Sequence, residues 1–174
     1  MKLGVLVVAA FGIAATGCAS QFGEATPERR AAMLHDFRDG KAELNCRLAC
    51  QLTYDHALAS LHVMHQTQDW AGLAENVLRI GYSSDLSYYY LGRAAEGLTY
   101  PKAALHYYQI SGGLATTDER GARCAASAQC NGIELPSALK PRIAAVNAQL
   151  APRRAAAPRP TTADDWVTPP PVTR

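Results

Sequence analysis

Residues 88–111, YYYLGRAAEGLTYPKAALHYYQIS, decide the fold of this chain. Apolar and small residues recur in it at every third or fourth position, in Tyr88, Leu91, Ala94, Ala95 and Leu98 and again in Ala104, Leu105, Tyr108 and Ile110. This is the spacing of one face of an α-helix. Pro101 stands at the start of the second run, where a missing backbone donor costs least. Because only a short turn joins the two helices, they must pack as an antiparallel hairpin.

Similar patterns on both sides of this hairpin predict an all-α chain. Further helices are predicted at 27–39, 53–66, 70–80 and 137–150, besides those that start after Ser84 and at Pro101. Local chemistry marks their ends, with N-caps at Thr26 and Asp69 and stops at Gly40, Gly81 and Gly112-Gly113. No segment alternates with period two for long enough to predict a strand. We expect short antiparallel hairpins that stack on one another, with the helices at 27–39 and 137–150 as caps.

The hairpins form a degenerate repeat. Trp70 and Pro101 open helices 101 − 70 = 31 residues apart, a spacing close to that of helical-hairpin solenoids. The run Tyr88-x-x-Leu91-Gly92-x-x-Ala95, followed by Ala104-x-x-x-Tyr108-x-x-Ser111, resembles the tetratricopeptide (TPR or Sel1-like) pattern. The resemblance covers about 60 residues and implies that Gly92 and Ala104 let helices approach closely, while Tyr108 fills the groove between them.

The N-terminus has the pattern of a secretory signal. Lys2 precedes thirteen uncharged residues, 3–15, and the small residues Thr16 and Gly17 follow. The apolar run is shorter than the roughly 20 residues that a membrane-spanning helix needs. Ala15-Thr16-Gly17-Cys18 resembles the lipobox of bacterial lipoproteins, which implies cleavage between Gly17 and Cys18 and a diacylglycerol thioether on Cys18. Ordinary secretion with an incidental Cys18, or a buried N-terminal helix, are the alternatives.

The residue after the lipobox cysteine bears on location. In Gram-negative lipoproteins an Asp at that position retains the protein in the inner membrane, and here it is Ala19. The resemblance thus implies a protein anchored to the outer membrane by lipid, with its domain in the periplasm. We divide the chain into a signal peptide (1–17), a lipidated tether (18–25), a TPR-like helical domain (26–150) and a Pro/Ala-rich tail (151–174).

The tail holds six of the ten prolines, so we expect it to be disordered with polyproline II character. Its simplest role is solubility or reach. A sharper hypothesis makes it a recognition segment in which Trp166 is an apolar anchor beside Asp164 and Asp165.

Five cysteines cannot all pair with one another. With Cys18 assigned to lipid, the other four are expected to form disulfides in an oxidising compartment. Cys124 and Cys130 share a Gly/Ala/Ser-rich loop that favours a local bond. A local bond between Cys46 and Cys50 requires a break in the helix before residue 53, because residues four apart on a helix have Cβ atoms about 5–6 Å apart, beyond the reach of a disulfide.

Other uses of these cysteines are open but weaker. Bonds between the two segments remain possible by spacing. A zinc site is disfavoured by the Cys-x3-Cys and Cys-x5-Cys spacings and by the compartment, and a thiol-redox enzyme by the lack of Cys-x-x-Cys.

Three consecutive tyrosines, 88–90, point in directions about 100° apart on a helix, so at least one is expected to face outward or into a groove. We take Tyr89 and Tyr90, together with Tyr82 and Arg93, as candidate partner-binding residues, because Tyr and Arg are enriched at interaction hot spots. Packing in the core is the alternative.

Motifs for catalysis are missing from the sequence. There is no Gly-rich phosphate loop, no Gly-x-Ser-x-Gly and no His-Glu-x-x-His, so we predict no enzyme activity and no cofactor. His62 and His65, near Asp69, have the spacing to share one helix face, but spacing fixes no third ligand, so a structural role is favoured and no metal site is predicted.

Charge and composition bound the function further. The net charge of +2, from 17 Lys and Arg against 15 Asp and Glu, gives no electrostatic case for nucleic acid. An apolar share of 48% is ordinary for a globular chain. We expect a periplasm-facing adaptor or assembly factor of an envelope machinery for secretion, pilus biogenesis or outer-membrane assembly. The alternatives are a structural lipoprotein whose tail reaches peptidoglycan and a small periplasmic hydrolase.

Overall fold

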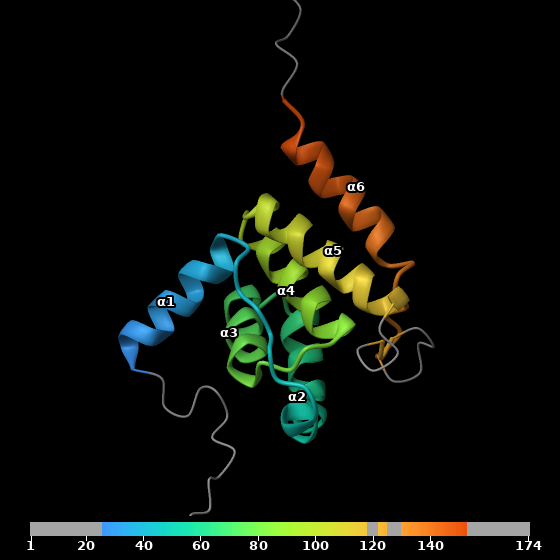
Figure 1. Ribbon diagram of the computed structural model, residues 1–174. Helices are drawn as coiled ribbons and strands as arrows, with labels where there is room; N and C mark the ends of the chain where they lie inside the picture. Colours follow the sequence, from blue (N-terminus) through green and yellow to red (C-terminus); the bar gives the residue numbers. More distant parts are fainter. Residues whose placement is uncertain (1–25, 118–121, 125–129, 153–174) are drawn as a thin grey trace, which may run out of the picture.

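The computed structural model describes residues 26–117, 122–124 and 130–152, within which the chain forms six helices and no strand (Figure 1). The helices are α1 (Pro27–Arg38), α2 (Leu48–Gln66), α3 (Trp70–Ile80), α4 (Asp85–Gly97), α5 (Pro101–Thr117) and α6 (Leu139–Leu150). The predicted all-α class is confirmed for this part. The predicted signal peptide and tether, and all but two residues of the tail, lie outside the described residues. None of the described helices combines the length and hydrophobicity needed to cross a bilayer.

Local capping chemistry fixes several helix ends where the sequence places them. The side chains of Thr26, Asp69 and Ser84 each accept a backbone N–H three residues later, at the first turns of α1, α3 and α4. Gly81 ends α3 with a φ of 68°, a left-handed conformation that costs glycine little.

Two predicted boundaries were wrong. The helix expected from residue 53 begins at Leu48, and the helix expected to end before Gly112-Gly113 continues to Thr117. Each helical glycine costs about 1 kcal/mol relative to alanine. Packing against α6 offsets that cost, because Gly112 lies against the side chain of Leu139.

Consecutive helices pack on one another from α2 to α6, and α4 lies at the centre in contact with α2, α3 and α5. The helix at the C-terminal end, α6, packs along α5, as expected of a cap. At the N-terminal end, α1 packs on α3, and Phe37 in its last turn stacks on Tyr107 of α5, while the first turns of α1 project away from the other helices (Figure 1). No other described helix covers the outer face of α2, where Leu48, Leu52 and Val63 are exposed.

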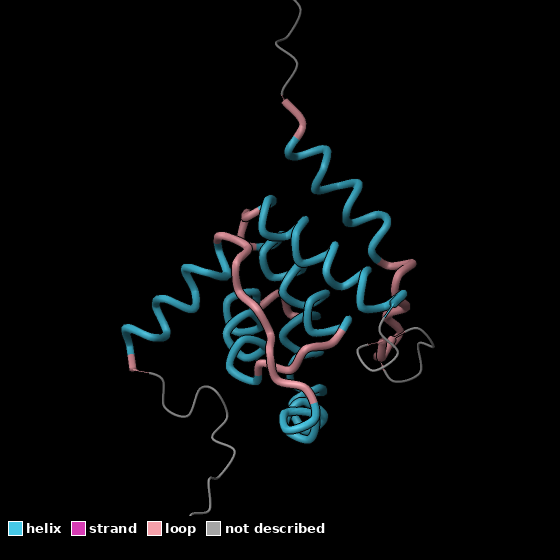
Figure 2. The backbone as a smooth tube through the Cα atoms, viewed as in Figure 1, coloured by secondary structure: helices cyan, strands magenta, loops and turns pink. Residues whose placement is uncertain are grey.

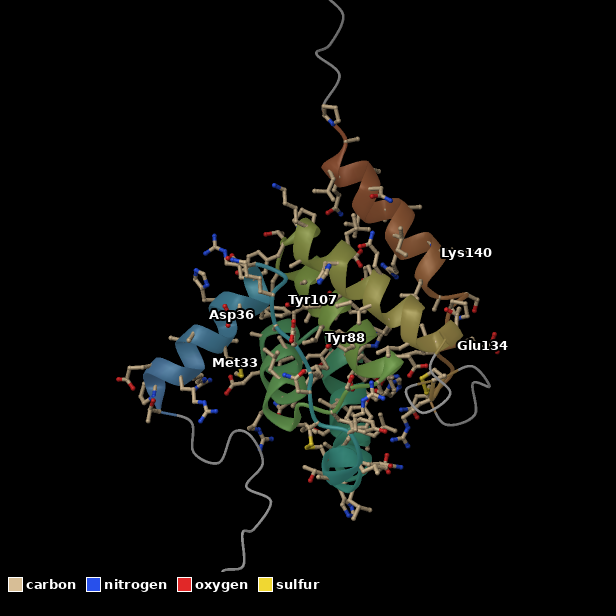
Figure 3. All side chains as sticks on the ribbon, viewed as in Figure 1. Met33, Asp36, Tyr88, Tyr107, Glu134 and Lys140 are labelled. Atoms are coloured by element: carbon tan, nitrogen blue, oxygen red, sulfur yellow. A yellow bond between two sulfur atoms is a disulfide. The ribbon has the colours of Figure 1, made fainter. Side chains whose placement is uncertain are left out.

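An extended segment, residues 41–47, connects α1 to α2 across the helices (Figure 2). Two tyrosine hydroxyls hold it: that of Tyr107 accepts the N–H of Ala42 at 3.3 Å, and that of Tyr88 accepts the N–H of Leu44 at 2.9 Å (Figure 3). Both tyrosines are buried, and their hydroxyls supply partners that the segment's backbone would otherwise lack.

Both described disulfides are local. Cys46 bonds to Cys50 and Cys124 to Cys130, with Cα–Cα distances of 5.8 and 5.6 Å. The break that the first bond requires lies at Arg47, whose φ and ψ of −109° and −104° separate the extended Cys46 from the helical Cys50. Cys46 also forms a short β-bridge with Tyr82, so this bond fixes the start of α2 to the loop between α3 and α4.

Close approach of α4 and α5 depends on Gly92. A β-carbon at Gly92 would overlap the ring of Tyr108, which is fully buried, and Ala104 on the same face of α5 is buried as well. These are the positions that the repeat pattern marked for small and aromatic residues. The central hairpin thus follows from its sequence spacing.

We predict that Gly92→Ala and Gly113→Ala have opposite effects on thermal unfolding. The first forces the methyl group into the Tyr108 ring and should destabilise the protein by about 1–3 kcal/mol. The second adds a methyl group that meets no atom within 4 Å apart from its chain neighbours and the backbone of its own helix, and it removes a flexible helical residue, so it should stabilise by up to about 1 kcal/mol. Equal shifts in midpoint temperature would contradict this packing.

Candidate functional site: a polar and aromatic network across α2 to α6

The described helices meet in a network around Glu96, near the end of α4. Its carboxylate accepts a hydrogen bond from the hydroxyl of Tyr108 at 2.5 Å and lies 3.4 Å from the Nη1 atoms of both Arg93 and Arg142. Arg93 is one turn earlier on α4, Tyr108 comes from α5 and Arg142 from α6. One acid thus ties three helices together.

Arg93 extends this network to the first hairpin. Its Nε donates to Nε2 of His65 on α2 at 3.3 Å, and its guanidinium lies 5.2 Å from the centre of the Trp70 ring at the start of α3. The indole fits there because Gly97 has no β-carbon for it to meet. A guanidinium over a tryptophan ring is attracted by the negative face of the ring.

His65 is neutral in this setting. Burial, with the positive charge of Arg93 as the next cause, lowers its pKa to about 4. Because Nε2 accepts from Arg93, the ring proton belongs on Nδ1. That atom is buried and has no partner among the described residues, and the same holds for Nδ1 of His62 one turn earlier.

Three of the four predicted partner-binding residues gather in or beside this network. Tyr89 and Tyr90 lie with ring centres 6.0 and 5.5 Å from that of His65, and Arg93 is a member. At least one of the three consecutive tyrosines was expected to face outward or into a groove; none faces outward, because α4 is enclosed by its neighbours and all three are buried. Tyr89 and Tyr90 are buried against His65 and do not line a surface.

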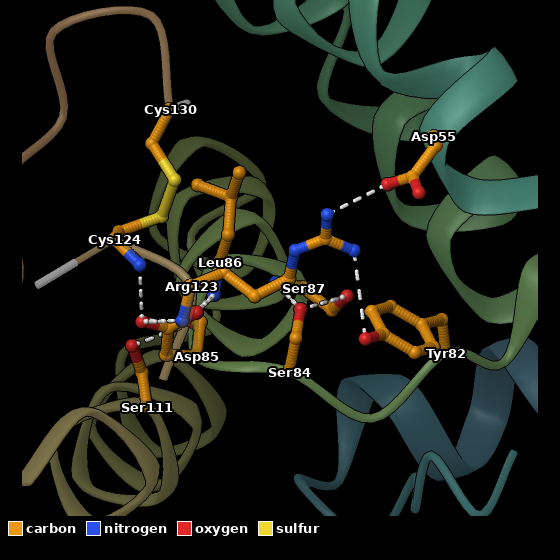
Figure 4. Close-up of a disulfide and its surroundings, with 10 residues drawn as sticks. All are labelled: Asp55, Tyr82, Ser84, Asp85, Leu86, Ser87, Ser111, Arg123, Cys124 and Cys130. Atoms are coloured by element: carbon orange, nitrogen blue, oxygen red, sulfur yellow. Dashed lines mark hydrogen bonds and ion pairs between the residues drawn. A yellow bond between two sulfur atoms is a disulfide. The ribbon is translucent and has the colours of Figure 1, made fainter. Parts of the chain in front are cut away.

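Tyr82 belongs to a different cluster, shown in Figure 4. Its hydroxyl lies 3.5 Å from Nη1 of Arg123, and the Nη2 atom of that residue pairs with Asp55 of α2 at 2.8 Å. The same guanidinium lies over the rings of Tyr54 and Tyr82. Tyr82 is buried too, so it contributes no open surface.

The second cluster also anchors the Cys124–Cys130 loop. Asp85 is completely buried, and its Oδ2 accepts the backbone N–H groups of Arg123 and Cys124 at 3.0 and 2.9 Å (Figure 4). Ser111 of α5 donates to the carbonyl of Asp85 at 2.8 Å. Sequence reasoning missed Asp85, whose only local signal is an acid in the first turn of a helix.

His62 and His65 are not joined by a third metal-binding side chain among the described residues. Within residues 26–117, 122–124 and 130–152, no three His, Cys, Asp or Glu side chains are grouped so as to hold a metal ion. The network around Glu96 holds α2, α4, α5 and α6 together, and it reaches solvent at the edge formed by α6. The most open part of that edge is Arg142, whose side chain is 42% exposed.

We predict that His65 makes stability depend on pH between about 4 and 6.5. In that range the unfolded chain, with an ordinary histidine pKa near 6.5, binds a proton that the folded chain excludes. Stability should therefore fall as pH drops through this range and be unaffected by His65 above it. The slope should stay below about 1.4 kcal/mol per pH unit, since the ring is only half-buried.

The matched test compares His65→Gln with His56→Gln. His56 lies on the exposed face of the same helix. Urea unfolding at several pH values should show a shallower slope for the first variant only. Identical slopes for both variants would contradict a buried neutral His65.

Comparison with known proteins leaves the function to be argued from these sites, since neither a family model, nor a curated protein, nor a solved structure matches the chain.

Proposed function

We propose that this protein is an outer-membrane lipoprotein whose helical domain binds a protein partner in the periplasm, as an adaptor or assembly factor of an envelope machinery. Two features support the anchor. The sequence from Lys2 to Cys18 has the charge, apolar run and Gly-Cys end of a lipoprotein signal. The local disulfides use the other four cysteines, so Cys18 has no intramolecular partner and its thiol is left for acylation.

The observation that carries the binding role is the continuity of the network along alternate helices. His65 of α2, Arg93 and Glu96 of α4, and Arg142 of α6 follow one another through direct contacts. In a TPR-like array, which we propose for α2 to α6, the first helix of each hairpin faces the same side. An extended or helical segment of a partner would lie along that side, with Arg142 and Trp70 at the contact.

Site-specific photocrosslinking in the living cell tests this role. A photoreactive residue at Arg142 should capture one defined envelope protein, identified by mass spectrometry and confirmed by reciprocal capture. The matched position is Lys140, an exposed residue of the same helix, where capture of that protein should be lost. Equal capture from both positions, or attachment to peptidoglycan without a protein partner, would contradict the proposal and favour a structural envelope role.

A further inference from the structure

The exposed face of α2 carries large apolar side chains, which the exposed faces of the other described helices lack. The large apolar side chains that stand out most are Leu48, Leu52 and Val63, exposed by 84%, 73% and 55%, and all three belong to α2. With Ala59, which is also exposed, they lie along one side of the helix. We call these four residues the α2 stripe.

The surroundings of the stripe are poor in charge. Asp55 and His56 are the only titratable side chains among the exposed residues of α2, and Asp55 is paired with Arg123. By contrast, α1 exposes Glu28, Arg29, Arg30, Asp36 and Arg38. A scarcity of charged residues around exposed apolar side chains is typical of the core of a protein interface. A helix that binds a membrane surface instead carries Lys and Arg on its polar face, and the exposed residues within α2 include neither.

The spacing of the stripe identifies the occupant. Residues 48, 52, 59 and 63 are separated by 4, 7 and 4 positions, which reads the same in both directions. When two copies of α2 pack antiparallel about a two-fold axis, Leu48 meets Val63 of the second copy and Leu52 meets Ala59. Large residues thus face smaller ones along about 22 Å of helix. A two-fold interface requires this self-complementarity.

The residues at the centre of that pairing are compatible with it. The axis passes between Asp55 and His56, so Asp55 of each copy, which is paired with Arg123 of its own chain, faces His56 of the other. The α1 helix does not cover this face. A single pair of helices buries less than the roughly 1,200 Å² of a standard interface, which places the association in the weak, concentration-dependent class.

We propose that the α2 stripe is a two-fold self-association surface, through which a second copy of this chain packs antiparallel on α2. The proposal goes beyond partner binding, because the stripe lies on the side of α2 away from His65 and the network. Its register is specific: position 52 of one copy faces position 59 of the other.

Opposite charges introduced at positions 52 and 59, singly and together, test both the surface and the register. The protein is purified as the cell processes it, in a mild detergent, and its sedimentation equilibrium is measured from about 10 μM to 1 mM. The original chain should show a reversible dimer. Leu52→Lys and Ala59→Glu should each weaken it about tenfold or more, while the double variant should regain most of the affinity, since the introduced lysine of one copy faces the introduced glutamate of the other.

Ala144→Lys, at an exposed position of α6, is the matched control and should leave the dimer unchanged. Circular dichroism melting checks that each variant folds. A monomer at all concentrations, single variants that associate as the original chain does, or a double variant weaker than both singles would each overturn the proposal. Loss of vesicle binding in Leu52→Lys without any dimer would overturn it in favour of a membrane contact.

Discussion

Cys18→Ser should release the protein from the membrane entirely. If the thiol carries diacylglycerol, each buried methylene contributes about 0.8 kcal/mol, and two or more chains give stable attachment. None of the described helices is able to span the bilayer in their place. The variant should therefore lose incorporation of labelled palmitate and move from the membrane to the soluble fraction, or accumulate as an unprocessed precursor.

Two companion variants make this result specific. Ser20→Ala, two residues beyond the lipobox cysteine, should keep both the label and the membrane fraction. Ala19→Asp should keep the label but move the protein from the outer to the inner membrane on a density gradient, as the lipoprotein resemblance implies. Palmitate labelling that persists in Cys18→Ser would place the lipid elsewhere and contradict the anchor.

Much of the helical fold could be predicted because its signals are local. The capping side chains of Thr26, Asp69 and Ser84 act within three residues, and the close contact between Gly92 and Tyr108 follows from one hairpin's spacing. The start of α2 has no such signal: its N-cap, Arg47, makes no side-chain cap, and the leucines of its first turns point to solvent rather than to the core. Apolar periodicity therefore misplaced that end.

The candidate site was only partly predictable because its contacts join distant residues. Arg142 meets Glu96 across 46 positions, and Arg93 meets His65 across 28. At least one of the three consecutive tyrosines was expected to face outward or into a groove, but the central position of α4 buries them all. Hot-spot enrichment of tyrosine and arginine singled out Arg93, which the fold places in the network, but which side chains stay exposed depends on how the helices pack.

Asp85→Ala should have the largest effect on stability of any polar substitution in the described part of the chain. The side chain is completely buried, and removing it leaves the N–H groups of Arg123 and Cys124 without their acceptor. Each buried group left unsatisfied costs about 1–3 kcal/mol, so a loss of about 3 kcal/mol or more is expected in urea unfolding. The N–H of Leu86, which bonds Oδ1 of Asp85 at 2.7 Å, adds to this loss.

The matched control is Asp36→Ala on α1, where the side chain is exposed and a change within about 0.5 kcal/mol is expected. A second readout separates anchoring of the loop from general destabilisation. Cys124 is fully buried, and Asp85 holds its backbone against α4, so its bond to Cys130 is shielded from reductants.

In Asp85→Ala that disulfide should be reduced faster by a small thiol under conditions where the domain stays folded, while the Cys46–Cys50 bond should keep its original rate. Equal acceleration of both bonds would show that the whole domain had loosened. An unchanged rate for Cys124–Cys130 would show that its loop is held by other contacts, and the role of Asp85 as the anchor between that loop and the start of α4 would then be wrong.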